Sequence, residues 1–566
     1  MKCLLVFVLR DKCRYLLAWF FLSLALSSAQ LLLPAAFSQG PIAVRIDELI
    51  HQRADGTLSP LASDEAFLRR IYLDLVGRIP TLAETREFLT RRSPQRRAQV
   101  VDALLASDEY PLRMAQLFDV MLNERRGEHV EWRGFLRQAF KENRPWDRIT
   151  REILNPDVTQ NISRGAAFFY TGRLKRYGQV PADVPGLVRD IGRMFLGVDV
   201  QCAQCHDHLF IDDYAQVDYQ GLLAFVGNTY IRTDHPFPAV AEKQLTEKVQ
   251  FASVFDGEQK KTGPRLPGGV EFDVPKFEPG EEFLVPPDKK KKTLGVRKFS
   301  TLRILAAELP RSDNRGFARN IVNRLWWVMM GRGLVDPLDL HHPDNPPSHP
   351  ELLETLTDAM IAHQFDIKWF LRELALSGTY QRSSQLPGGF SDGQILLPQS
   401  YRVALERPLS AEQLLQSTLT ATGVEQSWSI DPTGAKAGQD QSAIAAKEEQ
   451  QQEWIKLFQA AFANPPKEPE IEIAPSVRAA LFLMNDTTFL GWFESRPGNL
   501  VHRLAALDGD RLVAEELYLT VLTRRPSTDE ILEVHTYLAA DPAERTKRLG
   551  YLAWALVTST EFCVNH

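Results

Sequence analysis

Cysteine is scarce in this chain, with five residues among 566. Cys3 and Cys13 belong to the first segment, which leaves Cys202, Cys205 and Cys563 for the rest of the protein. Three cysteines do not make the disulfide framework that stabilises many small exported domains. We therefore expect a hydrophobic core to hold the fold, and 44% of the residues are hydrophobic.

Charge of one sign is also scarce. The formal net charge is -6, and the only run of like charges is four lysines at 289–292, which we interpret as a solvated loop. Nucleic-acid binders carry a basic face, so we expect no nucleic-acid partner. The G-x-S-x-G, H-E-x-x-H and P-loop motifs are absent, and whether the protein is an enzyme is left open.

Long apolar runs are missing after the first segment. The stretch YLLAWFFLSLAL at 15–26 follows several basic residues and precedes small residues at 27–29. It is shorter than the roughly 20 residues of a membrane span and is typical of a signal peptide. We expect residues 1–39 to be an export signal, with an uncleaved anchor as the alternative. The remainder is then periplasmic or at the cell surface, with no later transmembrane span.

Amphipathic helical periodicity dominates the rest of the chain. It predicts helices at 66–76, 97–105, 112–122, 131–140, 184–195, 216–226, 316–330, 352–362 and 365–376. Capping boxes are expected from Thr81 to Glu84 and from Ser348 to Glu351, and Gly331 is expected to end a helix. The polar stretch 435–452 is expected to be an exposed loop or frayed helix. The predicted fold class is mainly α.

Composition changes between residues 233 and 298, where Pro, Gly and Lys become frequent and short alternating runs appear. We interpret this stretch as an irregular β-containing insertion, with a disordered linker as the alternative. It divides the predicted mature chain into a helical domain at 40–232 and a second helical domain at 299–566.

Two distant segments resemble each other. YLDLVGRIPTLAE at 72–84 matches YLTVLTRRPSTDE at 518–530, and LLASDEY at 104–110 matches LVTSTEF at 556–562. A solenoid needs several adjacent repeats, which these are not. We predict two related helical hairpins that pack on one another or on equivalent surfaces.

The segment QCAQCHDH at 201–208 contains C-x-x-C-H, which in an exported protein signals covalent attachment of c-type haem. Cys202 and Cys205 would bond the haem, and His206 would be an axial ligand. Zinc is the first alternative, with His206 or His208 as a third ligand and a distant fourth. A local disulfide is the second.

A second haem ligand has several candidates, none distinguished by the sequence. The histidines among them are more typical of a surface and the methionines of a core: His235, His341, His342, His349, Met194, Met329 and Met330. If haem is bound, we expect an apolar cavity beside His206 with walls formed by Met194, Phe195, Leu222 and Phe225.

These motifs together resemble the planctomycete-type cytochrome-c-like family of secreted proteins. The pattern C-A-Q-C-H-x-H-x-F runs from Cys202 to Phe210, after RMFLG at 193–197. The second half resembles the usual partner domain of unknown function, through NIVNRLWWVMMGRGL at 320–334 and RPLSAEQLLQSTLTATG at 407–423. The chain departs from the family at Tyr214, usually Trp, and at 328–329, where a His is usual. It also lacks the additional cytochrome c module of many relatives.

Three functions follow as hypotheses. The resemblance and the motif favour an exported haem c protein with an electron-transfer or redox role and an unknown redox or envelope partner. A metal-dependent envelope hydrolase would use His206, Asp207 and His208. In a structural or binding protein of the envelope, the motif would only stabilise the local fold.

Overall fold

The computed structural model of the chain describes residues 42–161, 163–175, 182–235, 237–255, 257–288, 290, 293–388, 395–424, 441–470 and 476–566. The predicted export signal at 1–39 lies outside these ranges. The mainly α prediction is confirmed, because 55% of the structure is helical and its sheets have only two strands. None of the helices in the described ranges has the length and hydropathy required to cross a bilayer.

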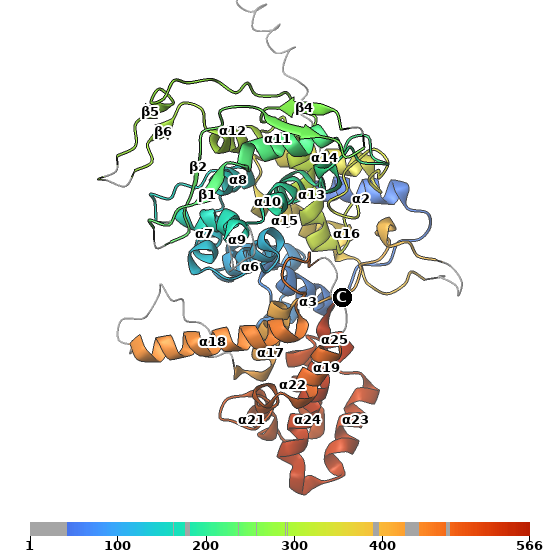
Figure 1. Ribbon diagram of the computed structural model, residues 1–566. Coiled ribbons are helices and arrows are strands. Elements are labelled where there is room, and N and C mark those ends of the chain that lie inside the picture. The colour runs from blue at the N-terminus through green and yellow to red at the C-terminus, as the bar shows by residue number, and fades with distance from the viewer. Residues whose placement is uncertain are drawn as a thin grey trace, which may run out of the picture.

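The helices form two bodies that lie one above the other in Figure 1. The N-terminal body contains α2 (Ile42–Arg53), α3 (Asp64–Leu75), α4 (Leu82–Thr90), α5 (Arg96–Ala106), α6 (Glu109–Asn123), α7 (Val130–Lys141), α8 (Trp146–Leu154), α9 (Phe168–Leu174), α10 (Val184–Ile191), α11 (Gln216–Val226), α12 (Thr301–Glu308), α13 (Arg315–Met330), α14 (Pro350–Ala362), α15 (Ile367–Leu376) and α16 (Gly378–Gln381).

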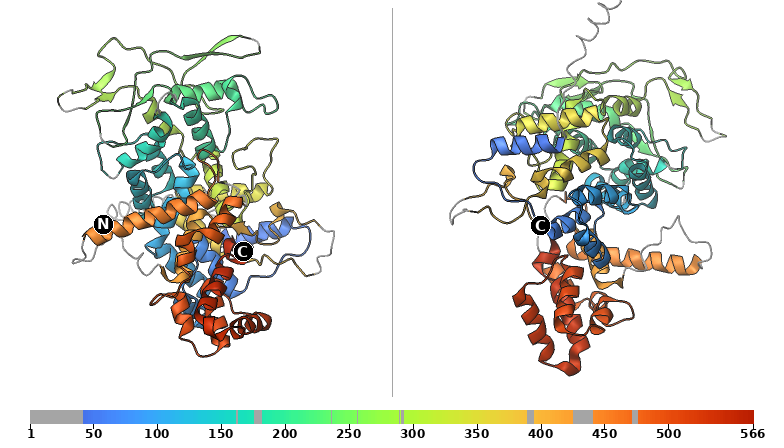
Figure 2. Two further views of the ribbon diagram at one scale, coloured as in Figure 1. Left: turned by 60° about the horizontal axis from the view of Figure 1, so that its bottom comes forward. Right: turned by 180° about the vertical axis from the view of Figure 1, so that it is seen from behind.

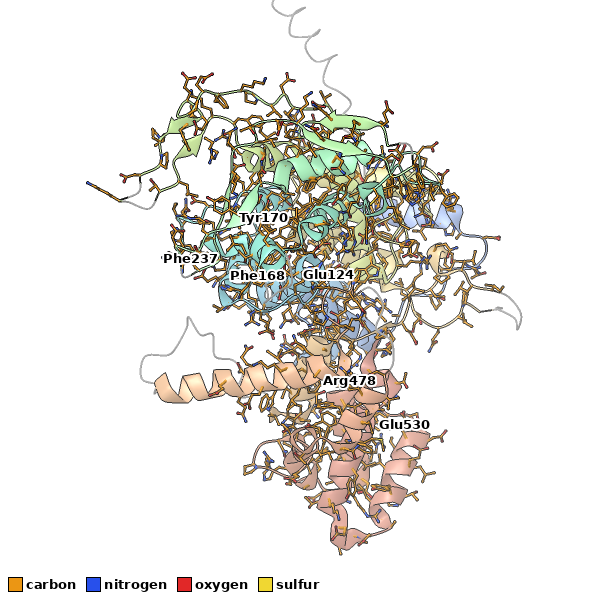
Figure 3. All side chains as sticks on the ribbon, in the orientation of Figure 1. Glu124, Phe168, Tyr170, Phe237, Arg478 and Glu530 are labelled. Atoms are coloured by element: carbon orange, nitrogen blue, oxygen red, sulfur yellow. The ribbon has the colours of Figure 1, made fainter. Side chains whose placement is uncertain are left out.

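The C-terminal body contains α17 (Ala411–Thr422), α18 (Gln441–Phe462), α19 (Val477–Asn485), α20 (Thr487–Gly491), α21 (Leu500–Ala505), α22 (Asp510–Val521), α23 (Thr528–Ala539), α24 (Arg545–Val557) and α25 (Thr560–Cys563). Helix α18 extends sideways from this body in each of the views (Figures 1 and 2). In Figure 3, Glu124 lies in the N-terminal body, and Glu530 lies in the C-terminal body.

Each body has its own hydrophobic core. The first core runs from Ile46 to Tyr401 and includes helices from both sides of the insertion; Trp146 of α8 stacks on Phe317 of α13 with centroids 6.4 Å apart. The second core contains residues from 409 to 562, together with Leu73 of α3 and Ile79. The loop after α3 therefore joins the two bodies, while other residues of α3 pack in the first core.

Three antiparallel hairpins confirm the β content of the insertion, although the first strand begins just before it. They pair β1 (Thr229–Ile231) with β2 (Val240–Glu242), β3 (Val249–Ala252) with β4 (Gln259–Thr262), and β5 (Phe283–Val285) with β6 (Val296–Arg297). In Figure 1, β4, β5 and β6 lie at the upper edge of the N-terminal body, and β1 and β2 lie lower at its left side. A fourth pair, β7 (Arg407–Pro408) with β8 (Val564–Asn565), brings the last residues back to the junction of the bodies.

Several local predictions are confirmed and two are corrected. The Thr81–Glu84 capping box forms, and Gly331 ends α13 at a φ of 84°. The second capping box is wrong: Pro350 begins α14, so His349 takes the N-cap position and makes no side-chain cap. The predicted helix at 184–195 also changes form, because α10 stops at Ile191 and a π-helical turn, Gly192–Leu196, follows.

The predicted repeat is confirmed as two helix-turn-helix units, α3–α4 and α22–α23. They also contact one another. Arg69 of α3 is fully buried and donates to the carbonyl of Val521 at 3.2 Å and to that of Phe562 at 2.7 Å. Arg69 thus satisfies one carbonyl group at the end of α22 and one in α25, which links the first unit to the second unit and to α25.

Candidate functional site

The C-x-x-C-H segment lies between the π-helical turn and α11. Cys202–Gln204 form a short 3-10 helix whose last carbonyl accepts bonds from the side chains of Gln216 and Gln220 of α11. The carbonyl of Cys205 accepts from the amide of Val254, just after β3. Hydrogen bonds to its carbonyl groups therefore hold the segment from both sides, and its thiols remain exposed to solvent.

Both thiols of the motif are exposed and free, rather than joined as a disulfide. Cys202 begins the 3-10 helix and Cys205 takes its C-cap position, and both residues are exposed to solvent.

His206 has one ring nitrogen engaged and the other available. Nδ1 lies 2.6 Å from the carbonyl oxygen of Asp207, and a carbonyl only accepts, so this bond places the proton on Nδ1. Nε2 then carries the lone pair. Histidine ligands of metals are commonly oriented by this kind of bond to a backbone carbonyl.

His208 has a different role in the structure. Its Nδ1 accepts hydrogen bonds from the amides of Phe210 and Ile211, at 3.2 and 3.1 Å, and so closes the turn after the motif. Its ring stands edge-on to Tyr214, which in turn contacts the ring of His342. The motif and the 341–342 loop of the second half are therefore packed together through Tyr214.

Most of the candidates for a second haem ligand are buried by packing. Met194, Met329 and Met330 belong to the first core, as expected. His349 is buried against Tyr401, which corrects the expectation of a surface histidine, and burial lowers its pKa to about 4. Burial likewise lowers the pKa of His341 to about 4. The described residues contain no group of three or more His, Cys, Asp or Glu arranged for a metal ion.

The four predicted wall residues do not form an open slot beside His206. Phe195, Leu222 and Phe225 are completely buried, because the π-helical turn and α11 direct these side chains into the first core. The apolar side chains that do flank the motif are exposed at the surface: Leu209, Phe210, Val254 and Phe255. The ring of Phe255 lies 4.7 Å from that of His206, centroid to centroid.

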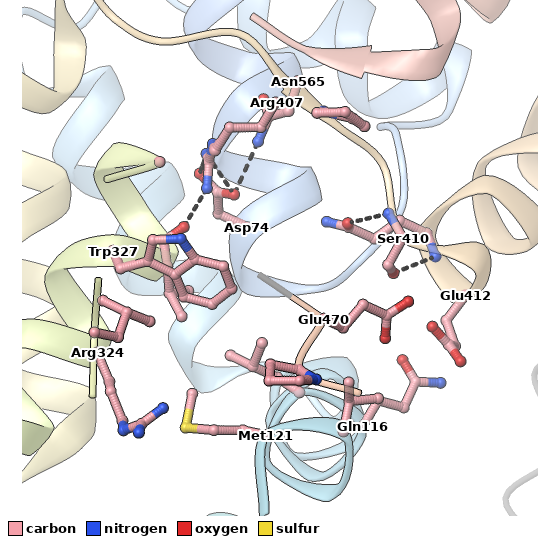
Figure 4. A pocket seen from close by; sticks show the side chains of 18 of the residues that line it. Asp74, Gln116, Met121, Arg324, Trp327, Arg407, Ser410, Glu412, Glu470 and Asn565 are labelled. Carbon is pink, nitrogen blue, oxygen red and sulfur yellow. Dashed lines mark hydrogen bonds and ion pairs between the residues drawn. The ribbon is translucent and has the colours of Figure 1, made fainter. Parts of the chain in front are cut away.

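A cavity of about 460 Å³ lies elsewhere, where the two bodies meet (Figure 4). Its walls come from α3, α6, α13 and the π-helical turn on one side, and from the start of α17, Glu470 and Asn565 on the other. The sequence did not predict this cavity, because its charged residues are scattered along the chain and form no motif. The one available signal was that Asp74, which lines it, departs from the internal repeat.

Two family models match the chain. One is described as "PSCyt2: Protein of unknown function (DUF1549)" and matches residues 45–230; the other is "PSD1: Protein of unknown function (DUF1553)" and matches residues 303–538. No curated protein and no solved structure matches. The two matches, in this order, support membership of the planctomycete-type family in which these two domains are paired.

Proposed function

We propose that this chain is an exported protein that binds haem c through Cys202 and Cys205, with His206 as an axial ligand, and exchanges electrons with a partner in the cell envelope. The observation that carries the proposal is the bond from His206 Nδ1 to the carbonyl of Asp207, which leaves Nε2 as a ligand beside two free thiols.

The surroundings fit a surface-bound group of this kind. Phe210 and Phe255 are 82% and 69% exposed, and large apolar side chains beside the thiols supply area for burial against a porphyrin. Haem bound here would supply one-electron transfer. The thiols of Cys202 and Cys205 would hold it, and the carbonyl of Asp207 would orient His206.

The proposal is tested by expressing the protein with a c-type maturation system and staining for haem after denaturation. We expect covalent haem in the wild type and none after joint substitution Cys202→Ala and Cys205→Ala. The matched control is Cys563→Ala, which removes the remaining cysteine of the described chain and should keep the haem.

A second variant separates attachment from ligation. His206→Ala should retain covalent haem but change its visible spectrum, because only the axial ligand is lost. Haem that is released from the denatured wild type would refute the proposal. Stoichiometric zinc in haem-free protein, lost in the double cysteine variant, would favour the metal alternative instead.

A further inference from the structure

Arg113 of α6 is a buried cation that is not paired with any described residue. It is 8% exposed, lines the cavity between the bodies, and makes no hydrogen bond or ion pair with any other described residue. A buried charge is costly unless it is paired. Burial accordingly lowers the pKa of this guanidinium.

The other arginines of the cavity are all paired. Arg193 bonds Asp339 at 2.9 Å and Glu124 at 2.9 Å, and Arg324 also bonds Asp339. Arg407 bonds both oxygens of Asp74 at 3.0 Å. Among the described arginines that line the cavity, Arg113 is therefore the one without an ion pair.

The acids that face Arg113 are already engaged. Asp74 is held by Arg407, and Glu412 and Glu470 are both held by Arg125, each at 2.7 Å. Figure 4 shows Glu412 and Glu470 next to one another on one wall of the cavity. None of these three carboxylates bonds Arg113, so its guanidinium is left as a hydrogen-bond donor at the cavity wall.

Four further polar atoms of described residues that line the cavity are buried without a hydrogen-bond partner: Oε1 of Glu124, Nε of Arg407, Oε1 of Glu470 and Oδ1 of Asn565. The last two are acceptors that a ligand hydroxyl could reach. Both carboxyl and amide oxygens accept hydrogen bonds from hydroxyl groups. Burial raises the pKa of Glu470, and the attraction of Arg125 opposes this shift.

The backbone beside Arg113 is shaped for this side chain. Gly77 has a φ of 81°, and a Cβ there would lie 2.9 Å from Cδ of Arg113. The equivalent position of the second hairpin is Thr523, which has a left-handed backbone with a larger side chain. Glycine at 77 thus makes room for the arginine where the repeat tolerates a larger residue.

We propose that this cavity binds a small hydroxylated organic anion, with its oxyanion on Arg113 and its hydroxyl groups near Glu470 and Asn565. A cavity of about 460 Å³ is within the usual range for small-molecule sites. Apolar side chains, among them Leu117, Met121 and Trp327, supply the rest of the wall. Arginine is the side chain best suited to bind a planar or tetrahedral oxyanion with two hydrogen bonds.

Calorimetric titration of the purified protein tests the ligand class. The probes are D-galacturonate and glucose 6-phosphate, with D-galactose as the neutral match and inorganic phosphate as the bare oxyanion. We expect at least one sugar anion to bind about tenfold or more tightly than galactose and inorganic phosphate. A comparison of D-galacturonate with glucose 6-phosphate then shows whether the site prefers a carboxylate or a phosphate group. Equal binding of galactose, or equally tight binding of phosphate alone, would overturn the proposal.

Arg113→Met tests the anchor. We expect this variant to bind the preferred anion at least about tenfold more weakly, and to melt at the same or a higher temperature than wild type, because an unpaired buried charge is gone. Arg496→Met, on the exposed surface, is the control and should change neither. Undiminished anion binding by Arg113→Met would refute its role, and a large loss of melting temperature with unchanged binding would show a purely structural one.

Discussion

The two related hairpins have the same skeleton in different surroundings. In each, an arginine bridges two glutamates and lies over a tyrosine ring: Arg78 with Glu84, Glu109 and Tyr72, and Arg524 with Glu530, Glu561 and Tyr518. The first hairpin lies at the junction of both cores, whereas the second lies in the C-terminal body (Figure 1).

Two of the differences between the hairpins fall beside the cavity. Asp74 stands where the second hairpin has Thr520, and Gly77 where it has Thr523. Asp74 lines the cavity, and Gly77 accommodates Arg113. The shared skeleton therefore builds both hairpins, and these two departures adapt the first hairpin to the cavity.

The largest expected contrast is between Asp74→Val and Thr520→Val. Asp74 is buried and accepts from Arg407, from the Tyr380 hydroxyl at 2.8 Å and from Asn565 at 2.8 Å. Its loss leaves these donors unpaired and should lower the free energy of unfolding by about 4 kcal/mol. The Thr520 hydroxyl has no hydrogen-bond partner, so its loss should change this energy by less than about 0.5 kcal/mol. Denaturant unfolding measures both, and equal costs would contradict the comparison.

A swap at the turn should have the next largest effect. Gly77→Thr forces a β-branched side chain onto a left-handed backbone and against Arg113, and should cost about 3 kcal/mol of unfolding free energy. Thr523→Gly, at a φ of 62°, should change it by less than about 1 kcal/mol, because strain relief offsets the lost side chain. A tolerated Gly77→Thr, seen as an unchanged unfolding curve, would show that Arg113 moves freely.

The two bridging arginines should differ by a smaller margin. The side chain of Arg78 is 10% exposed and that of Arg524 is 32% exposed. Substitution by alanine should cost about 2 kcal/mol of unfolding free energy at Arg78 and about 1 kcal/mol at Arg524, because the more exposed ion pairs are weakened by solvent. A reversed order in denaturant unfolding would mean that burial does not control their strength.

The Arg524 bridge also predicts a dependence on pH. Hydrogen bonding from Arg524 is the main cause that lowers the pKa of Glu530 to about 2. A lowered folded-state pKa stabilises the protein above the unfolded-state pKa of roughly 4.3, and this contribution is lost as the pH falls toward 2. The stability difference between wild type and Arg524→Ala should therefore shrink from pH 6 to pH 2, and a constant difference would contradict the assignment.

The smallest expected difference is at the caps. The amide of Glu84 donates to Thr81 Oγ1 at 3.2 Å, and that of Glu530 donates to Ser527 Oγ at 3.2 Å. Thr81→Ala and Ser527→Ala should each cost about 1 kcal/mol of unfolding free energy, and the two costs should agree within about 0.5 kcal/mol. Thermal or denaturant unfolding of the two variants is the check, and clearly unequal costs would show that the caps depend on their surroundings.

Much of the helical architecture was predictable because it depends on neighbours in the sequence. Periodicity predicted α11 at its observed bounds, and the capping pattern predicted the start of α4. The capping box predicted at Ser348 does not form, because Pro350 is the first helical residue and His349 therefore takes the N-cap position. Phe195, Leu222 and Phe225 do not line a cavity beside His206. Periodicity identifies the apolar face of a helix, but it does not show which part of the protein that face packs against.

By itself, the amino-acid sequence determined the mainly helical fold, the repeat and the C-x-x-C-H segment, because these are patterns of residue type at fixed spacing. Only the tertiary structure decided that the thiols face solvent and that Arg113 is left without a partner beside a cavity. Burial and pairing of a charge depend on which distant segments pack around it. The segments that bring acids near Arg113 are α3, α17 and the stretch that ends at Glu470. No local pattern in α6 predicts that these segments pack there.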